Sequence, residues 1–180
     1  MVRERLVASF TWRTDPWSEY RYADDSEWWR HPEIVAGLGA CLAGLNSQAS
    51  AAATVVMGTE SRGFAVALLV AAHLGIGVAE VRKEPERASD DDRWLTQLTV
   101  PDYQDRHLEL ALRRSCLRTG DRVLFVDDWI ETGAQAVACR QLVSQAGAVW
   151  LGAHVMVDGL TNASVRRELG VARILHRRDL

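Results

Sequence analysis

The chain has 180 residues, 48% of them hydrophobic, and a formal net charge of -3 at pH 7. This length and apolar content suit one compact domain with a substantial core. The charge balance lacks the basic excess that drives binding to a nucleic-acid backbone, so we expect no nucleic-acid partner.

The cellular compartment follows from what the sequence lacks. The first ten residues have no apolar run of the kind that a signal peptide needs, and no later segment approaches membrane-spanning length. Cys41, Cys116 and Cys139 are odd in number and far apart, which favours reduced core thiols over disulfides or a metal site. We therefore expect a cytoplasmic protein that does not bind membranes.

The first part of the chain, residues 1–32, is predicted to form an N-terminal hood segment on a domain that spans residues 33–180. Its region from Phe10 to His31 is rich in aromatic side chains: Trp12, Trp17, Tyr20, Tyr22, Trp28 and Trp29. Such rings commonly seal the end of a small core. They could also form a hood over a flat ligand, because an aromatic face stacks well on a planar base.

Short apolar segments alternate with helical ones along the rest of the chain. Strands are predicted at Thr54–Gly58, Gly77–Val81, Arg122–Val126 and Ala148–Val157, because these runs are β-branched and apolar. Helices are predicted at Glu33–Leu45, Gly63–Leu74, Ala134–Ala146 and Asn162–Leu169, where small apolar residues recur at three- and four-residue spacing. This alternation predicts an α/β fold with a mainly parallel central sheet flanked by helices, and a ligand outside the carboxyl ends of the strands.

Two segments after the second predicted strand do not follow this alternation. Glu84–Asp92 is charged and contains Pro85, which indicates a mobile loop. Trp94–Ala111 reads as a loop or a hairpin, in which Arg106–Leu110 alternates like a strand. These segments are therefore predicted to lie outside the regular α/β units.

The third predicted strand leads into VLFVDDWIETGAQA, Val123 to Ala136. Asp127 and Asp128 follow a run that is apolar on both faces, so two carboxylates meet at the end of a buried strand and need donors or a cation. Thr132 is predicted to cap the next helix, and Gly133 lets the chain turn and expose amides that attract an anion. A sugar phosphate would satisfy both ends of this loop. The alternative is an ordinary turn with solvated acids.

Other motifs for phosphate or acid chemistry fit this chain less well. It contains no Gly-Lys-Ser/Thr, which excludes a P-loop, and Gly37-Leu38-Gly39 follows no predicted strand and lacks the third glycine of a dinucleotide site. A receiver domain needs a lysine after the acids, and none follows. Nucleotide-sugar or phosphatase chemistry would favour an Asp-x-Asp spacing, which this acid pair lacks.

The acid-rich motif resembles a known family. VLFVDDWIETGAQ is similar to the phosphoribosyl pyrophosphate (PRPP) signature of type I phosphoribosyltransferases. VVMGTESRGFAVALLVAAHLGIGVAEVRKE, Val55 to Glu84, is similar to the adenine phosphoribosyltransferase branch, and VMVDGLTNASVRRELG also fits it. The resemblance covers roughly Glu33 to the C-terminus, with separate motifs in matching order and spacing. It implies a type I phosphoribosyltransferase-like fold with a small N-terminal hood and a mobile loop or hairpin.

The resemblance implies a role for each end of the acid-rich motif. Asp127 and Asp128 would hold the ribose hydroxyls of PRPP. The residues that would hold its 5′-phosphate are Thr132, Gly133, Ala134 and Gln135. Glu131, Ala134 and Gln135 depart from the small residues and final threonine that are usual in the family, and Glu131 places a negative charge beside the phosphate unless it points outward.

Pyrophosphate would bind on a separate turn. The resemblance assigns it to Glu60, Ser61, Arg62 and Gly63. Arg82 and Lys83 would add positive charge for the pyrophosphate. In the resembling family this charge can come from across a dimer interface. The chemistry agrees, because an arginine fork and a glycine-backed turn suit a diphosphate. For Arg62 alone, the alternative is a surface salt bridge. Magnesium would bridge the pyrophosphate and the ribose hydroxyls, held mainly by PRPP and water, with little direct protein ligation.

The acceptor side is less well defined by the sequence. In the adenine enzymes the mobile loop carries a Glu-Tyr pair whose acid is placed to protonate the base, and this chain has Asp102-Tyr103 instead. Asp102 is therefore the candidate general acid or base, beside Asp127 and Asp128 in the predicted catalytic set, with loop solvation as its alternative. Tyr22 and Trp29 are both candidates to stack on the base.

These features predict a phosphoribosyltransferase, a pentosyltransferase that moves the 5-phosphoribosyl group of PRPP to a purine-type base and releases pyrophosphate. Adenine, as in purine salvage, is the default acceptor, and a related purine or a base of a specialised salvage or biosynthetic pathway is the alternative. A non-catalytic PRPP sensor is the alternative function, although Arg62, Lys83 and Asp102 favour an enzyme. The expected assembly is a magnesium-dependent homodimer.

Overall fold

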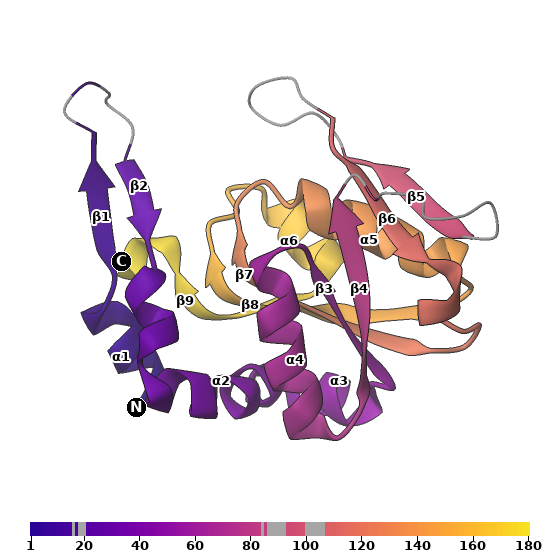
Figure 1. The fold of residues 1–180 in the computed structure, drawn as a ribbon, viewed down its shortest axis with the longest axis horizontal. Helices are drawn as coiled ribbons and strands as arrows, with labels where there is room; N and C mark the ends of the chain where they lie inside the picture. Colours follow the sequence, from indigo (N-terminus) through magenta and orange to yellow (C-terminus); the bar gives the residue numbers. More distant parts are fainter. Residues whose placement is uncertain (16, 18–20, 84, 86–92, 100–106) are drawn as a thin grey trace.

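The computed structural model describes residues 1–15, 17, 21–83, 85, 93–99 and 107–180. The helices are α1 (Val2–Ala8), α2 (Pro32–Ala43), α3 (Ser47–Ala52), α4 (Arg62–Leu74), α5 (Ala134–Gln145) and α6 (Ala163–Leu169), with 3-10 turns η1 (Ser26–Arg30), η2 (Gly44–Asn46), η3 (Arg114–Cys116) and η4 (Arg177–Asp179). The strands are β1 (Thr11–Thr14), β2 (Arg21–Asp24), β3 (Val55–Thr59), β4 (Gly77–Lys83), β5 (Trp94–Leu98), β6 (Glu109–Arg113), β7 (Arg122–Ile130), β8 (Val149–Asp158) and β9 (Val171–His176). Figure 1 shows them as a central sheet with helices around it and a separate N-terminal hairpin.

The central sheet has seven strands in the order β5-β6-β4-β3-β7-β8-β9. The strands from β4 to β9 in this order are parallel to their neighbours, whereas β6 and β5 continue the sheet in antiparallel pairing. This arrangement confirms the predicted α/β fold with a mainly parallel sheet. The segment predicted as a loop or hairpin supplies β5 and β6, and β9 is a strand that the sequence interpretation did not include.

Strand β7 shows how the sheet is covered on both faces. Val123 and Phe125 belong to a buried cluster that includes residues of α5, whereas Leu124 and Val126 belong to a second cluster with residues of α2 and α4. Successive side chains of a strand point to opposite faces, so a strand covered on both sides must be apolar throughout. The apolar run of β7 therefore fixes its place in the middle of the sheet.

The helical stretch Pro32–Ala52 corrects one expectation from the sequence. It has 21 residues and is mostly apolar, so its length and composition alone would allow it to cross a membrane. In the structure the stretch is divided into α2, η2 and α3, and Ile34, Leu38 and Leu42 are fully buried in the core. A core helix passes the same test because the face that packs against the sheet must be apolar.

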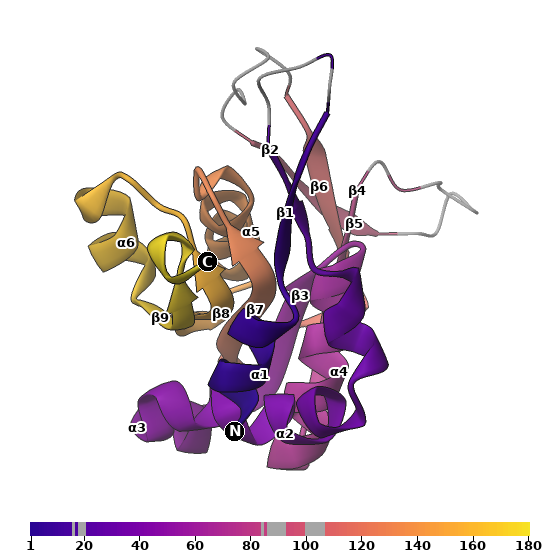
Figure 2. The same ribbon diagram turned by 90° about the vertical axis from the view of Figure 1, so that its left-hand side faces the viewer.

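The segment predicted as a hood consists of α1, the antiparallel hairpin β1–β2 and η1. Trp28 of η1 is fully buried, and its indole Nε1 donates to the carbonyl of Leu6 at 2.8 Å. Both residues belong to the cluster that contains α2 and α4. Figures 1 and 2 show the hairpin rising on the side of the sheet where the parallel strand β4 ends. The aromatic-rich segment thus both seals the core and extends beside the carboxyl ends of the strands.

Candidate active site

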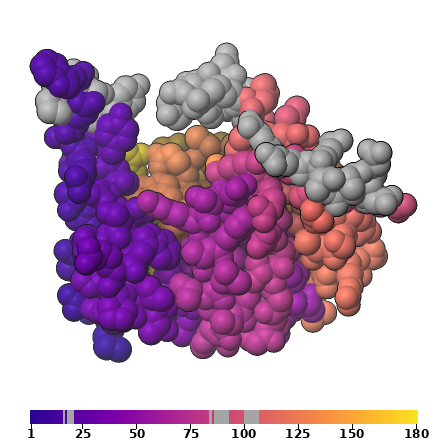
Figure 3. All heavy atoms as spheres, viewed as in Figure 1, coloured from indigo at the N-terminus to yellow at the C-terminus, as the bar shows by residue number. Residues whose placement is uncertain are grey.

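The candidate site lies where two neighbouring parallel strands separate. β3 and β7 pair only through Val55–Met57 and Val123–Phe125. Helix α4, which follows β3, and helix α5, which follows β7, pack in the clusters on opposite faces of the sheet. Open α/β sheets bind ligands at such a point, because the diverging chains leave a crevice at the carboxyl ends. In Figure 3 the surface is hollowed between the hood and the later part of the chain.

Asp127 and Asp128 lie just past this separation. The sequence suggested that the two acids follow the strand. They are instead part of β7, because pairing with β8 extends this strand to Ile130. Asp127 is buried, and its carboxylate accepts from the Thr59 hydroxyl and from the Asp128 amide, each at 3.0 Å. Burial, and then the charge of Asp128, raise the pKa of Asp127 well above its ordinary value. The ionised form of such an acid is stabilised by a ligand that donates hydrogen bonds or carries positive charge.

Gly63 allows the turn between β3 and α4 to pass close to these acids. A Cβ at this position would lie 2.8 Å from Oδ1 of Asp127 and 3.2 Å from the hydroxyl oxygen of Thr59. In the same turn, the peptide bond between Glu60 and Ser61 is cis. The Glu60 carboxylate accepts from the backbone amide of Lys83 at 2.9 Å, so the turn is tied to the end of β4. The structure therefore brings the predicted pyrophosphate turn next to the predicted ribose acids.

Arg62 on this turn lies between two acids. Its guanidinium NH1 forms a hydrogen-bonded ion pair with Asp25, and the same nitrogen lies 3.6 Å from Oδ2 of Asp128. The Asp25 side chain is only 6% exposed, so this pair differs from the surface salt bridge considered as the alternative. Burial raises the pKa of Asp25, although the charge of Arg62 opposes the shift. Sequence reasoning missed Asp25, whose only signal was its place before the Trp28-Trp29 pair.

The end of β4 contributes the cations Arg82 and Lys83, which both line a cavity of about 480 Å³ together with Glu60. They have different partners. The Arg82 guanidinium donates to Glu80 at 2.9 Å and lies 5.6 Å from the ring centroid of Phe64. The backbone of Lys83 is held by Glu60, as described above. This cavity places positive charge beside the β3–α4 turn.

The predicted phosphate loop forms the start of α5. Gly133 is the N-cap residue, with a φ of 82°, and Thr132 precedes it, which moves the predicted cap by one residue. The Thr132 hydroxyl still accepts from the amide of Ala134, at 3.3 Å. A Cβ on Gly133 would lie 2.8 Å from Cγ1 of Val165. The left-handed backbone and this close approach together require glycine.

Glu131 was the residue expected to disturb a phosphate unless it pointed outward. Its carboxylate accepts from the indole Nε1 of Trp129 at 2.8 Å and forms an ion pair with Arg177 of η4. The negative charge is therefore paired with a cation from the far end of the chain. Sequence reasoning did not anticipate Arg177, because 46 residues separate the two partners.

Residues 26–169 match the family model of the phosphoribosyl transferase domain. The chain belongs to this family. An adenine phosphoribosyltransferase from Synechococcus sp. strain RCC307 is 33% identical over 150 residues, which are 81% of this chain and 74% of that relative. The predicted resemblance to the adenine branch of the type I phosphoribosyltransferases is thereby confirmed.

Two further relatives are similar to this chain. An adenine phosphoribosyltransferase from Synechococcus sp. strain JA-2-3B'a(2-13) is 45% identical over 94 residues, 52% of this chain and 50% of the relative. The chain thus spans about half the length of this curated relative. The crystal structure of adenine phosphoribosyltransferase from Rhodothermus marinus superposes with a TM-score of 0.79 and 28% identity, covering 97% of this chain and 98% of that one.

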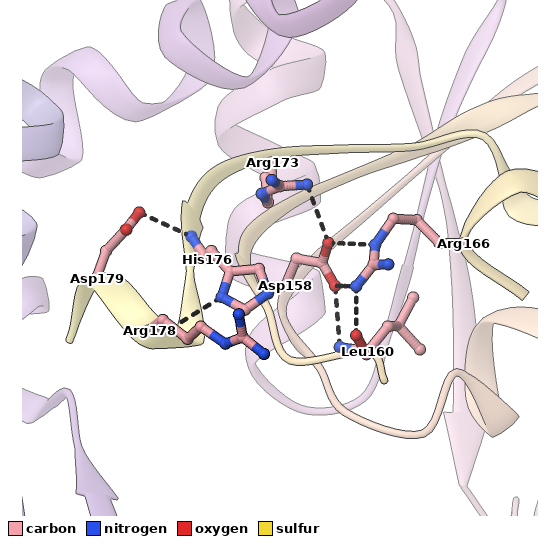
Figure 4. A network of polar contacts seen from close by, with 7 residues as sticks. All are labelled: Asp158, Leu160, Arg166, Arg173, His176, Arg178 and Asp179. Carbon is pink, nitrogen blue, oxygen red and sulfur yellow. Dashed lines mark hydrogen bonds and ion pairs between the residues drawn. The ribbon is translucent and has the colours of Figure 1, made fainter. Parts of the chain in front are cut away.

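A second polar network lies beside the predicted phosphate loop (Figure 4). Asp158, at the end of β8, is fully buried and accepts from Nε of Arg166 at 2.8 Å, from Arg173 at 3.3 Å and from the Leu160 amide at 2.9 Å. Burial alone would raise the pKa of Asp158, but the hydrogen bonds and charges of these partners lower it. The network holds Leu160, whose Cδ2 would lie 3.2 Å from a Cβ on Gly133.

Asp158→Asn is expected to reduce the free energy of unfolding at pH 7 by about 2 kcal/mol, because charge-assisted hydrogen bonds are lost. The pKa of Asp158 is lower in the folded state than its ordinary value of 3.8, so its stabilisation is complete above that value and is lost as the pH falls through the folded pKa. Urea unfolding from pH 7 to pH 3 should show wild type and variant converging below about pH 4. A difference that widens on acidification would contradict this account.

The candidates for the acceptor side have different environments. Tyr22 on β2 is 57% exposed, whereas Trp29 is partly buried against the core cluster and its indole Nε1 is buried with no hydrogen-bond partner among the described residues. Asp102 lies outside the residues that the structure describes. These three roles therefore stay predictions.

Proposed function

We propose that this protein transfers the 5-phosphoribosyl group of PRPP to adenine and releases pyrophosphate. The observation that carries the proposal is the acid pair at the point where β3 and β7 separate, in which Asp127 is buried and Asp128 is half-buried. The start of α5, with Gly133 as its N-cap residue, follows shortly after this pair in the chain. The family membership and the names of the two Synechococcus relatives, both adenine phosphoribosyltransferases, favour adenine over other bases.

In this proposal each part of PRPP meets a different element. The ribose hydroxyls donate to Asp127 and Asp128, which need donors because Asp127 is buried and the two carboxylates repel each other. The 5′-phosphate accepts from the amides of the loop Thr132–Gln135 at the helix amino end. Pyrophosphate lies against the turn Glu60–Gly63 and the cations at the end of β4. Because the charge of Glu131 is paired with Arg177, a phosphate in this loop would not face an unpaired carboxylate.

The chemical step would be displacement at the anomeric carbon. The bond from this carbon to the pyrophosphate oxygen breaks as a bond to a ring nitrogen of the base forms, and the sugar passes through a cation-like state. Asp127 and Asp128 would place negative charge next to that cation, and Lys83 would meet the charge that develops on the leaving group. Asp102 stays the candidate for moving a proton on the base. Positioning of the two substrates supplies much of the remaining acceleration.

Magnesium fits this site as a partner of PRPP. The hard carboxylate oxygens of Asp127 and Asp128 suit a hydrated magnesium ion, which keeps several waters and prefers oxygen ligands. Among the described residues no group of three or more His, Cys, Asp or Glu side chains is arranged to hold a metal. When bound, magnesium would supply charge neutralisation of the pyrophosphate. The protein residues would orient the ribose and accept its hydroxyl protons in hydrogen bonds.

The acceptor can be identified with a panel of bases. The protein is incubated with PRPP, magnesium and one of adenine, hypoxanthine, guanine, uracil or orotate, and pyrophosphate release is followed. Release that depends on adenine supports the proposal, whereas release with another base alone would reassign the acceptor. PRPP binding without pyrophosphate release for any base would favour the non-catalytic sensor. No observation on the described residues supports that alternative.

We also propose that the protein acts as a cytoplasmic homodimer, with residues 1–32 as a hood on the domain formed by residues 33–180. Support for the compartment comes from Cys41, Cys116 and Cys139, which are all free thiols. Support for the dimer comes from the resemblance of the Arg82-Lys83 strand end to the adenine branch. Light scattering during gel filtration would show a dimer or contradict it.

Asp128→Asn is expected to raise the dissociation constant for PRPP about 10- to 100-fold, because a hydrogen bond to a charged acceptor is lost. The fold should survive, since an asparagine oxygen can still accept from the Trp129 amide, as Asp128 Oδ1 does at 2.9 Å. Titration calorimetry with PRPP and magnesium measures the effect. Asp121→Asn is the matched control. Asp121 lies directly before the amino end of β7, away from the acid pair, so this variant should bind PRPP as wild type does. An unchanged affinity for Asp128→Asn would remove the ribose assignment.

A further inference from the structure

Asp25 is a buried acid that the predicted chemistry does not use. It follows β2 of the hood, and its side chain is 6% exposed. Its ion-pair partner is Arg62, 37 residues away on the turn that begins α4. A buried carboxylate without a partner is costly, so this contact ties the hood to the ribose and pyrophosphate sites.

The two acids near Arg62 hold it unequally. Both face the same guanidinium nitrogen, NH1. The contact with Asp25 is a hydrogen-bonded ion pair, whereas the distance to Oδ2 of Asp128 is 3.6 Å, which is too long for a hydrogen bond. Asp25 therefore keeps the cation away from full contact with Asp128.

Removal of the Asp25 charge would leave Asp128 as the nearest acid for this cation. The Arg62 side chain is 48% exposed and has room to move, so it would close the 3.6 Å gap and donate to Asp128. A carboxylate engaged by a guanidinium has fewer free lone pairs for a ligand hydroxyl.

We propose that Asp25 is a positioning residue that holds Arg62 off Asp128 and so keeps this acid free for the ribose of PRPP. The inference rests on the proposed function, because it assumes that Asp128 accepts from the sugar. It adds a residue of the hood to the determinants of PRPP affinity. The backbone role of Asp25, whose carbonyl accepts from the Trp28 amide at 3.0 Å, is separate from this and survives a side-chain change.

The test is a double-mutant cycle on PRPP binding. Dissociation constants for PRPP with magnesium are measured by calorimetry for wild type, Asp25→Asn, Arg62→Gln and the double variant. Asp25→Asn should weaken binding about tenfold in the wild-type background and change it by less than about twofold when Arg62 is already glutamine. Asp25→Glu, which keeps a carboxylate, should bind closer to wild type than Asp25→Asn does.

Asp24→Asn is the matched control. Asp24 is the neighbouring acid, and its carboxylate pairs with Arg13 and Ser26 within the hood and not with Arg62. This variant should bind PRPP as wild type does. Equal losses from Asp25→Asn in both backgrounds would overturn the inference, because they would indicate a general effect on the hood.

The outcomes separate this inference from the proposed function. If wild type binds no PRPP, the proposed function fails and the inference fails with it. If wild type binds PRPP and Asp25→Asn binds it equally well, only the inference is overturned. A steady-state readout adds a second criterion: Asp25→Asn should raise KM for PRPP and leave KM for the base unchanged.

Discussion

Asp127→Asn is expected to make the ligand-free protein more stable and to abolish its activity. Burial and the charge of Asp128 raise the pKa of Asp127 in the folded state, so the ionised acid costs folding free energy at pH 7. We therefore expect Asp127→Asn to have a higher free energy of unfolding than wild type at pH 7. The amide can keep both hydrogen bonds, because the Thr59 hydroxyl can rotate and accept from it.

The sign of the pH dependence makes this prediction specific. The folded-state pKa lies above the ordinary value of 3.8, so the cost is absent below that value and grows as the pH rises toward the folded pKa. The unfolding curves of wild type and Asp127→Asn should therefore coincide near pH 3 and separate toward pH 7. Asp158→Asn is the control of opposite sign. If Asp127→Asn is less stable than wild type at pH 7, the electrostatic account of the acid pair is wrong.

Gly133→Ala is expected to reduce kcat/KM about 100-fold or more and to lower the free energy of unfolding by about 2 kcal/mol. The alanine Cβ would lie 2.8 Å from Cγ1 of Val165, and a φ of 82° is costly for any residue with a side chain. The loop at the start of α5 must then shift, and a shift of about 1 Å is enough for a loss of this size if the loop positions phosphate as we propose.

The matched control for this substitution is Gly120→Ala. Gly120 has a similar φ of 86°, but a Cβ there would meet nothing within 4 Å. It lies before the amino end of β7, away from the acid pair. Gly120→Ala should therefore show the backbone strain alone, with kcat/KM close to wild type. Equal loss of activity in both variants would show that the close approach to Val165 is unimportant.

The sheet and its helices were predictable because their burial is written in short stretches of sequence. The run from Val123 to Val126 is apolar at every position, which only a strand covered on both faces requires. In α5, Ala136, Cys139 and Val143 recur at helical spacing, followed by the C-cap residue Ala146, and all four are buried. Strand β9 was missed because Val171–His176 is short, carries Arg173 and follows the helix directly after one glycine.

The polar contacts of the site were less predictable, because their partners are distant in sequence. The pairing of Asp25 with Arg62 depends on how the hood packs against α4, and no local pattern encodes it. The same holds for Glu131 and Arg177, which join the predicted phosphate loop to η4. The motif identified Glu131 as a departure from the family, but only the fold shows which cation pairs with it.

The most direct test of the central claim is the product of the reaction. Wild-type protein with PRPP, magnesium and adenine should form AMP and pyrophosphate in equal amounts, as measured by chromatography and a coupled pyrophosphate assay. Asp128→Asn should form both more slowly at limiting PRPP. If PRPP is consumed without AMP, or if no AMP forms while PRPP binds, the protein is not an adenine phosphoribosyltransferase.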